Sequence, residues 1–197
     1  MTSVTYQRLK YGNGDTYEGW WLLPQQCPHG PGVYTWAAGV KYDGSWQNGQ
    51  KHGFGIQTYP TGDRYEGGWK EGQWHGYGEL FRANEARTYR GGFCDGQEQG
   101  YASIKRTDGR FYEGGIRLGQ RHGYGNLVTT MGTMEGGFKF DKQEGWQEVR
   151  APMRHDYSGT YRDGKMHGTG RYVEYTTGKT FDGVWEWNEY KGKLAYK

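Results

Sequence analysis

One short pattern returns along almost the whole chain, about every 23 residues. It consists of an aromatic residue, any residue, glycine, any residue and a second bulky residue. The pattern starts at these positions: Tyr17, Tyr42, Tyr65, Tyr89, Tyr112, Met134, Tyr157 and Phe181. A fixed period between about 20 and 50 residues indicates an array of small, similar units. We therefore number repeats 1 to 7 from the first seven positions.

The repeats account for the chain from residue 5 onward and leave no room for another domain. We predict a single array over residues 5–197. It comprises a half repeat at 5–16, seven repeats that start at 17, 42, 65, 89, 112, 134 and 157, and a terminal partial repeat at 181–197.

Each repeat has the pattern of a β-hairpin. In repeat 3, side chains alternate over Tyr65–Lys70 and again over Gly76–Phe81, which is the period of a β-strand. The intervening EGQWH has the length of a hairpin loop, and turn residues such as Pro60–Asp63 precede the next strand. The sequence therefore predicts an all-β fold, a long antiparallel meander in a single layer.

The alternation of glycine with aromatic residues follows from packing. A single sheet without helices over it can bury apolar surface only against itself, so a large ring needs a space beside it. We expect Gly67 and Gly76 to provide such spaces for rings of neighbouring strands and to let the sheet twist.

Composition and charge exclude several classes of protein. Phe, Trp and Tyr make up 17% of the chain, which favours a folded protein even with 37 glycines. The 25 basic and 22 acidic residues are dispersed, so no block of charge suits nucleic acid. No apolar run approaches the roughly 18 residues of a membrane span, and the first residues lack a signal peptide, so we expect a cytoplasmic protein.

The residue types that usually carry chemistry fall into the repeat pattern. Five histidines occupy one slot in different repeats, about 10 Å apart by strand spacing, which is too far to share a metal: His29, His52, His75, His122 and His167. The Gly-x-Gly elements are not followed by a helix and so do not match a phosphate loop. Cys94 and Ser158 have no separately placed base. We expect no catalytic residue, no metal and no cofactor.

The two cysteines belong to different repeats. Cys27 lies in repeat 1 and Cys94 in repeat 4, about 30 Å apart along a regular array. A disulfide requires Cα atoms within roughly 7 Å. We therefore expect free thiols.

The pattern Y-x-G-x-W-x-x-G-x-x-H-G-x-G, followed closely over residues 42–55 and 65–78, resembles the MORN repeat (membrane occupation and recognition nexus). The resemblance covers nearly the entire chain. It implies an elongated single-layer antiparallel β-sheet of stacked hairpins that serves as a scaffold or recognises partners. Small stand-alone MORN proteins are often found in cilia, flagellar axonemes and radial spokes or as cytoskeletal adaptors, and some dimerise.

Two columns of aromatic residues lie on opposite faces of the predicted sheet. The candidates for a partner-binding groove form the first column: Tyr42, Trp46, Tyr65, Trp69, Tyr89, Phe93 and Tyr112. The second column comprises Phe54, Tyr77, Tyr101, Tyr124 and Trp146. Most of these rings can stabilise the sheet by cross-strand packing. Since a single layer cannot cover both faces, rings that stay exposed suit a protein-binding surface, and the face that binds is left open.

These observations favour a non-catalytic structural scaffold or adaptor. It would bind other proteins, cytoskeletal or axonemal ones by the resemblance, through the aromatic groove or its terminal edges, and a homodimer is compatible with the family. The alternative is a phosphoinositide or membrane-surface module, for which the dispersed basic residues are poorly suited. A third reading is a subunit that supports an enzyme in trans.

Repeat 6 departs most from the pattern. Met134 replaces the leading tyrosine, Gln147 replaces a glycine, and the connector RAPMRHD carries a proline where other connectors have glycine. We expect the regular stacking to change over residues 147–156, as a bend, a joint or a partner contact.

Overall fold

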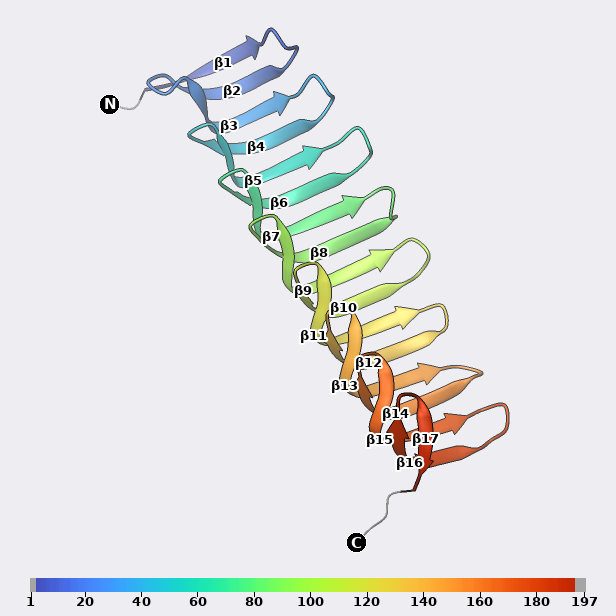
Figure 1. Ribbon diagram of the computed structural model, residues 1–197. Coiled ribbons are helices and arrows are strands. Elements are labelled where there is room, and N and C mark those ends of the chain that lie inside the picture. The colour runs from blue at the N-terminus through green and yellow to red at the C-terminus, as the bar shows by residue number, and fades with distance from the viewer. Residues whose placement is uncertain (1–2, 194–197) are drawn as a thin grey trace. The chain divides into compact units, whose positions relative to one another are not determined.

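The computed structural model describes residues 3–193, which form seventeen β-strands and no helix (Figure 1). This part of the chain therefore offers no helix that is long and apolar enough to cross a membrane. The chain divides into two compact units, residues 1–98 and 99–197. The end of the predicted terminal repeat, residues 194–197, lies outside the described residues.

Unit 1 contains these strands: β1 (Val4–Lys10), β2 (Thr16–Leu22), β3 (Cys27–Thr35), β4 (Lys41–Gln47), β5 (Gln50–Thr58), β6 (Arg64–Lys70), β7 (Gln73–Arg82) and β8 (Arg87–Cys94). Each strand pairs antiparallel with the next one in sequence, from β1–β2 to β7–β8. The unit is thus a single-layer meander.

Unit 2 begins two residues into β9 (Gln97–Arg106) and contains these further strands: β10 (Phe111–Arg117), β11 (Gln120–Thr129), β12 (Gly132–Lys139), β13 (Lys142–Ala151), β14 (His155–Arg162), β15 (Lys165–Glu174), β16 (Thr180–Glu186) and β17 (Glu189–Gly192). Its strands also pair antiparallel in sequence order, from β9–β10 to β16–β17. The predicted all-β meander of hairpins is confirmed.

The hairpin loops are shorter than the sequence suggested. In repeat 3 only Glu71 and Gly72 connect β6 to β7, with φ of 51° and 81°, and the rest of the predicted loop, Gln73–His75, belongs to β7. Two successive residues with positive φ define a type I′ turn, whose twist matches that of the paired strands. The hairpin therefore closes with two residues.

In six hairpins the second strand bends at the position that is His-Gly in most repeats. In repeat 2, Gly44 pairs with Gly55 but Trp46 pairs with Lys51, so three residues, 52–54, lie opposite Ser45. Five further hairpins, β2–β3, β6–β7, β10–β11, β12–β13 and β14–β15, show the same shift. Such a bulge bends the strand, and Figure 1 shows β5 and β7 curved along their length.

The glycine at this bend has a different role from the one expected. Gly76 has φ of 76°, and a Cβ built on it would meet no atom within 4 Å. Gly76 therefore adopts the left-handed backbone conformation that the bend requires and that glycine adopts readily. It does not make space for a ring. In repeats 1, 2, 3, 5 and 7 the spaces come from a pair of glycines, one two residues after the leading tyrosine and one directly across the hairpin. Repeat 4 has Ala102 at the second of these positions and still buries Tyr89.

These glycine pairs enclose the core. Tyr42 is completely buried, and a Cβ on Gly55 would lie 2.4 Å from its hydroxyl oxygen. The Tyr42 hydroxyl donates to the carbonyl of Ser45 at 2.9 Å, and its ring packs edge-on against Trp69 of the next repeat at 5.1 Å. The core is therefore a row of rings stacked from repeat to repeat.

Repeat 6 keeps the regular pairing. Strand β13 pairs with β14 without a register shift from Gly145 opposite Tyr161 to Ala151 opposite His155. The expected bend or joint over residues 147–156 is therefore wrong for these strands. The reason is local compensation: Gln147 is fully buried and donates to the carbonyl of Gly137, which matches the carbonyl that the tyrosine hydroxyl bonds in other repeats.

Candidate functional site

The first aromatic column lies in the core. Tyr42, Tyr65 and Tyr89 are completely buried, and the most exposed member, Trp46, keeps only 7% of its surface. The remaining members are similarly buried: Trp69, Phe93 and Tyr112. This burial corrects the expectation that the column lines a binding groove, because a partner cannot contact these rings while the repeats are folded.

The second aromatic column lies on the opposite, outer face and is exposed. In unit 1, Phe54 and Tyr77 keep 59% and 71% of their surface. In unit 2, Tyr101, Tyr124 and Trp146 keep 67%, 65% and 57%. We call these rings the outer aromatic strip of their unit, two rings in unit 1 and three in unit 2. Large rings that remain exposed on successive hairpins are typical of a surface that binds another protein.

The fold itself prevents neighbouring side chains from covering these rings. Phe54 lies directly opposite Gly68, and Tyr124 directly opposite Gly137. A Cβ on Gly68 would lie 2.1 Å from the carbonyl oxygen of His75, and a Cβ on Gly137 would be as close to that of Glu144. The residue beside each of these two rings therefore has to be glycine, and the ring stays accessible.

Carboxylates accompany the rings of the outer strip in unit 2. The Tyr124 hydroxyl donates to Glu135 at 2.6 Å, and this hydrogen bond raises the pKa of Tyr124. The pKa of Tyr101 is raised by desolvation and by the charge of Glu113. Glu148 lies directly opposite Glu135 on the neighbouring strand but already forms an ion pair with Arg150, so Glu113 and Glu135 supply the charge. The unit 2 strip thus combines aromatic faces with negative charge.

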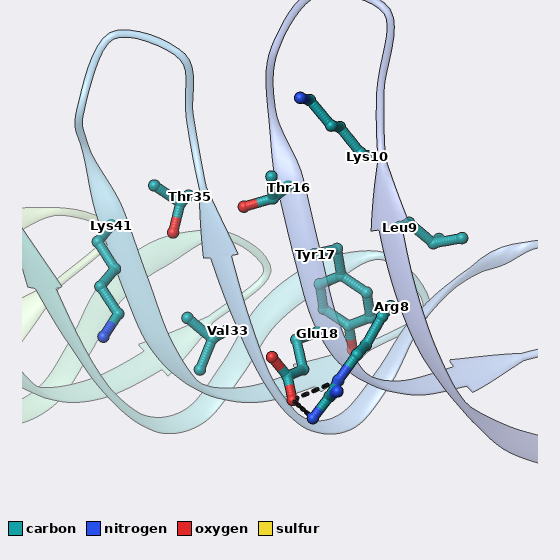
Figure 2. A pocket seen from close by; sticks show the side chains of 9 residues that line it. All are labelled: Arg8, Leu9, Lys10, Thr16, Tyr17, Glu18, Val33, Thr35 and Lys41. Carbon is teal, nitrogen blue, oxygen red and sulfur yellow. Dashed lines mark hydrogen bonds and ion pairs between the residues drawn. The ribbon is translucent and has the colours of Figure 1, made fainter.

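An open hollow of about 660 Å³ lies on unit 1, lined by residues of β1 to β4 (Figure 2). Arg8, Lys10 and Lys41 contribute cationic groups to its wall. Arg8 forms an ion pair with Glu18 at 2.9 Å, and the Lys41 ammonium lies 3.9 Å from a carboxylate of Asp43. Since two of the three cations already have an acidic neighbour, the hollow lacks the basic cluster that anionic membranes attract.

Four of the five slot histidines contact the hairpin turn of the following repeat, which the sequence pattern did not indicate. The His29 ring accepts a hydrogen bond from the backbone of Asn48 at 3.4 Å. The His122 ring packs against Phe140 at 4.8 Å, and other pairs are His75 with Asp95 and His167 with Trp187. The slot therefore connects consecutive repeats.

Lys51 extends into the buried ring row of unit 1. Its ammonium lies 4.2 Å from the centre of the Trp69 ring and donates to Gln57 at 2.5 Å. Both contacts favour the charged form, but burial outweighs them and lowers the pKa of Lys51 from its ordinary 10.5 to about 8. Near neutral pH the folded chain therefore carries a charged, partly buried Lys51, and this charge lowers the free energy of unfolding.

We expect the stability of unit 1 to rise between pH 8 and 10. Over this range the unfolded chain keeps the Lys51 proton that the folded chain has lost, and stability increases with pH wherever the unfolded state binds more protons. Above pH 10 the raised pKa of the buried Tyr42 acts in the opposite direction. Urea midpoints at pH 8, 9 and 10 should show the rise in the wild type but not in Lys51→Gln. Equal pH trends in both proteins would contradict this role of Lys51.

Comparison with known families identifies the repeat. The model of the MORN repeat matches five segments, residues 28–41, 42–64, 65–87, 112–134 and 157–173, which together cover half of the chain. The search of curated proteins gave no significant match. Four of the segments begin at a leading tyrosine that the structure buries: Tyr42, Tyr65, Tyr112 and Tyr157. The chain therefore belongs to the MORN-repeat family, whose repeats are generally protein- or membrane-interaction modules and typically form non-catalytic scaffolds.

Proposed function

We propose that this chain is a non-catalytic scaffold that binds other proteins through the outer aromatic strips of its two units, each strip by itself. The observation that carries the proposal is the exposure of the five strip rings, each more than half exposed, while the equivalent rings of the inner face are buried. Aromatic side chains are enriched at the centres of protein interfaces because they bury a large area with little loss of conformational freedom.

The chemistry of the unit 2 strip favours a partner segment that carries lysine or arginine. A guanidinium or ammonium group can lie over an exposed ring such as Tyr101 or Trp146 and pair with a carboxylate of the same face, Glu113 or Glu135. The ring area left between these charges suits aliphatic side chains. An extended basic and aliphatic segment, laid across successive hairpins, satisfies both requirements.

The proposal includes a place in a cytoskeletal assembly in the cytoplasm, such as a ciliary or flagellar axoneme or a radial spoke. Its support is the frequent occurrence of small stand-alone family members in such assemblies. Crosslinking mass spectrometry in native extract would identify the partner. Recovery of the chain crosslinked only to itself would indicate a homodimer, and retention on anionic vesicles without a protein partner would favour the membrane alternative.

Removing two rings of the unit 2 strip should strongly weaken partner binding without unfolding the chain. For the double variant Tyr124→Ser/Trp146→Ser we expect affinity for the identified partner to fall by about 30-fold or more, as for interface hot spots. Stability should change by no more than about 0.5 kcal/mol per site, because both rings are exposed. Titration calorimetry measures the affinity, and urea unfolding measures the stability.

The matched control is Met153→Ser. Met153 is 90% exposed and lies in unit 2 but outside the strip. Its substitution removes an exposed apolar side chain and should leave the affinity unchanged. Equal affinities for the wild type and the folded double variant would exclude the strip as the binding surface.

A further inference from the structure

We propose that His75, Cys94 and Asp95 of unit 1 form a binding site for a divalent transition metal ion, zinc in the first place. His75 lies on β7, Cys94 ends β8, and Asp95 begins the turn that follows β8. The site therefore joins the histidine slot of repeat 3 to the turn of repeat 4. It is separate from the outer aromatic strip and independent of the proposed function.

The three side chains already stand close to the spacing that a metal requires. One ligand atom from each lies within 4.8 Å of the other two. The Nδ1 atom of His75 is 3.7 Å from a carboxylate oxygen of Asp95, and the Cys94 sulfur is 3.7 Å from the other oxygen. Around a tetrahedral zinc ion with bonds of about 2.0 to 2.3 Å, neighbouring ligand atoms are about 3.3 to 3.8 Å apart. The remaining separations of the three ligand atoms are at most 4.8 Å and have to shorten by about 1 Å.

The unpaired nitrogen of His75 supports the assignment independently. Its Nδ1 atom is buried and makes no hydrogen bond within the described part of the chain. An unsatisfied buried polar atom costs free energy. The carboxylate at 3.7 Å is too distant for a hydrogen bond. A metal bound between Nδ1 and Asp95 would satisfy both atoms.

The corresponding junctions of other repeats lack this set of donors. His122 and His167 also bury an unpaired Nδ1, but each packs against a ring, Phe140 or Trp187, which offers no ligand. The residue that matches Cys94 is Lys70 in repeat 3 and Lys139 in repeat 6, and an ammonium repels a metal ion. The thiol and carboxylate therefore coincide with a slot histidine at this junction.

The donor set indicates the kind of metal. Imidazole, thiolate and carboxylate together suit zinc, and three protein ligands leave a fourth position for water. The Asp95 side chain is 80% exposed, so solvent and metal ions can reach the site. Binding would displace the thiol proton of Cys94 and fix the turn after β8 to β7.

Metal titration of the full chain tests the site. After treatment with EDTA, the wild type should bind one zinc ion per chain in competition with a chromophoric chelator. Cobalt should give the charge-transfer absorption of a thiolate ligand. Cys94→Ser and His75→Gln should each weaken zinc binding by about 100-fold. A loss of this size is at least as large as that caused by removing a group that only supports a metal ligand.

The controls are a second free thiol and a second slot histidine of unit 1. Cys27→Ser and His52→Gln should retain the affinity and the cobalt–thiolate band. Circular dichroism establishes that each variant is folded before titration. The proposal is overturned if the wild type binds no zinc, or if the band survives in folded Cys94→Ser and disappears in folded Cys27→Ser.

Discussion

Replacing Gly55 with alanine should destabilise unit 1 by about 3 kcal/mol, although the change adds a single methyl group. The new Cβ would lie 2.4 Å from the hydroxyl oxygen of Tyr42 and 2.5 Å from two carbons of its ring. The ring cannot withdraw, because it is completely buried and its hydroxyl is bonded to the carbonyl of Ser45. Urea unfolding followed by tryptophan fluorescence measures the loss.

Two glycine variants separate this clash from the general effect of alanine. A Cβ on Gly12 meets no atom within 4 Å, and its backbone is not left-handed, so Gly12→Ala should leave stability nearly unchanged. Gly76 also has open space but a φ of 76°, so Gly76→Ala should cost about 1 kcal/mol through backbone strain alone. A loss for Gly55→Ala no larger than that for Gly76→Ala would contradict enclosure of the ring by the glycine pair.

The meander could be predicted from the sequence because its cause is local. The pattern repeats a leading tyrosine and a glycine two residues later with a constant period. Each repeat therefore places a ring and the space beside it on the same face of a strand. The two-residue turns were also recognisable, since Asn48–Gly49 and Asp163–Gly164 are typical type I′ pairs. The loop predicted for repeat 3 is longer than the observed turn, because Gln73–His75 belong to β7 and the bulge at Gly76 interrupts the alternation of that strand.

The exposed face could not be predicted from alternation alone. Tyr65 and Tyr77 are both aromatic residues in strands with glycine neighbours, yet one is completely buried and the other is 71% exposed. The difference depends on the direction in which the bulge bends the sheet, which is a property of the folded backbone. The contact of His75 with Asp95 was missed for a related reason: equivalent slots were compared, whereas the contact runs from one repeat to the turn of the next.

Restoring the common residue at one position of repeat 6 should lower the stability of the chain. Restoring it at two positions should leave most of the stability intact. In Met134→Tyr, the new ring would have to occupy the space that the buried Gln147 fills, at a cost of about 2 to 3 kcal/mol. In Gln147→Gly, a cavity opens and the carbonyl of Gly137 loses its donor, with a loss of about the same size.

The double variant Met134→Tyr/Gln147→Gly should recover most of the stability. Gly136 and Gln147 are directly paired, as Gly114 and Gly125 are in repeat 5, so the second glycine recreates the space that encloses Tyr112 there. The new tyrosine hydroxyl would then donate to the Gly137 carbonyl. Urea unfolding of the wild type, both single variants and the double variant gives the coupling energy, which we expect to exceed about 2 kcal/mol. If the two losses simply add, Gln147 does not replace the tyrosine, and the regular pairing of β13 with β14 must have another cause.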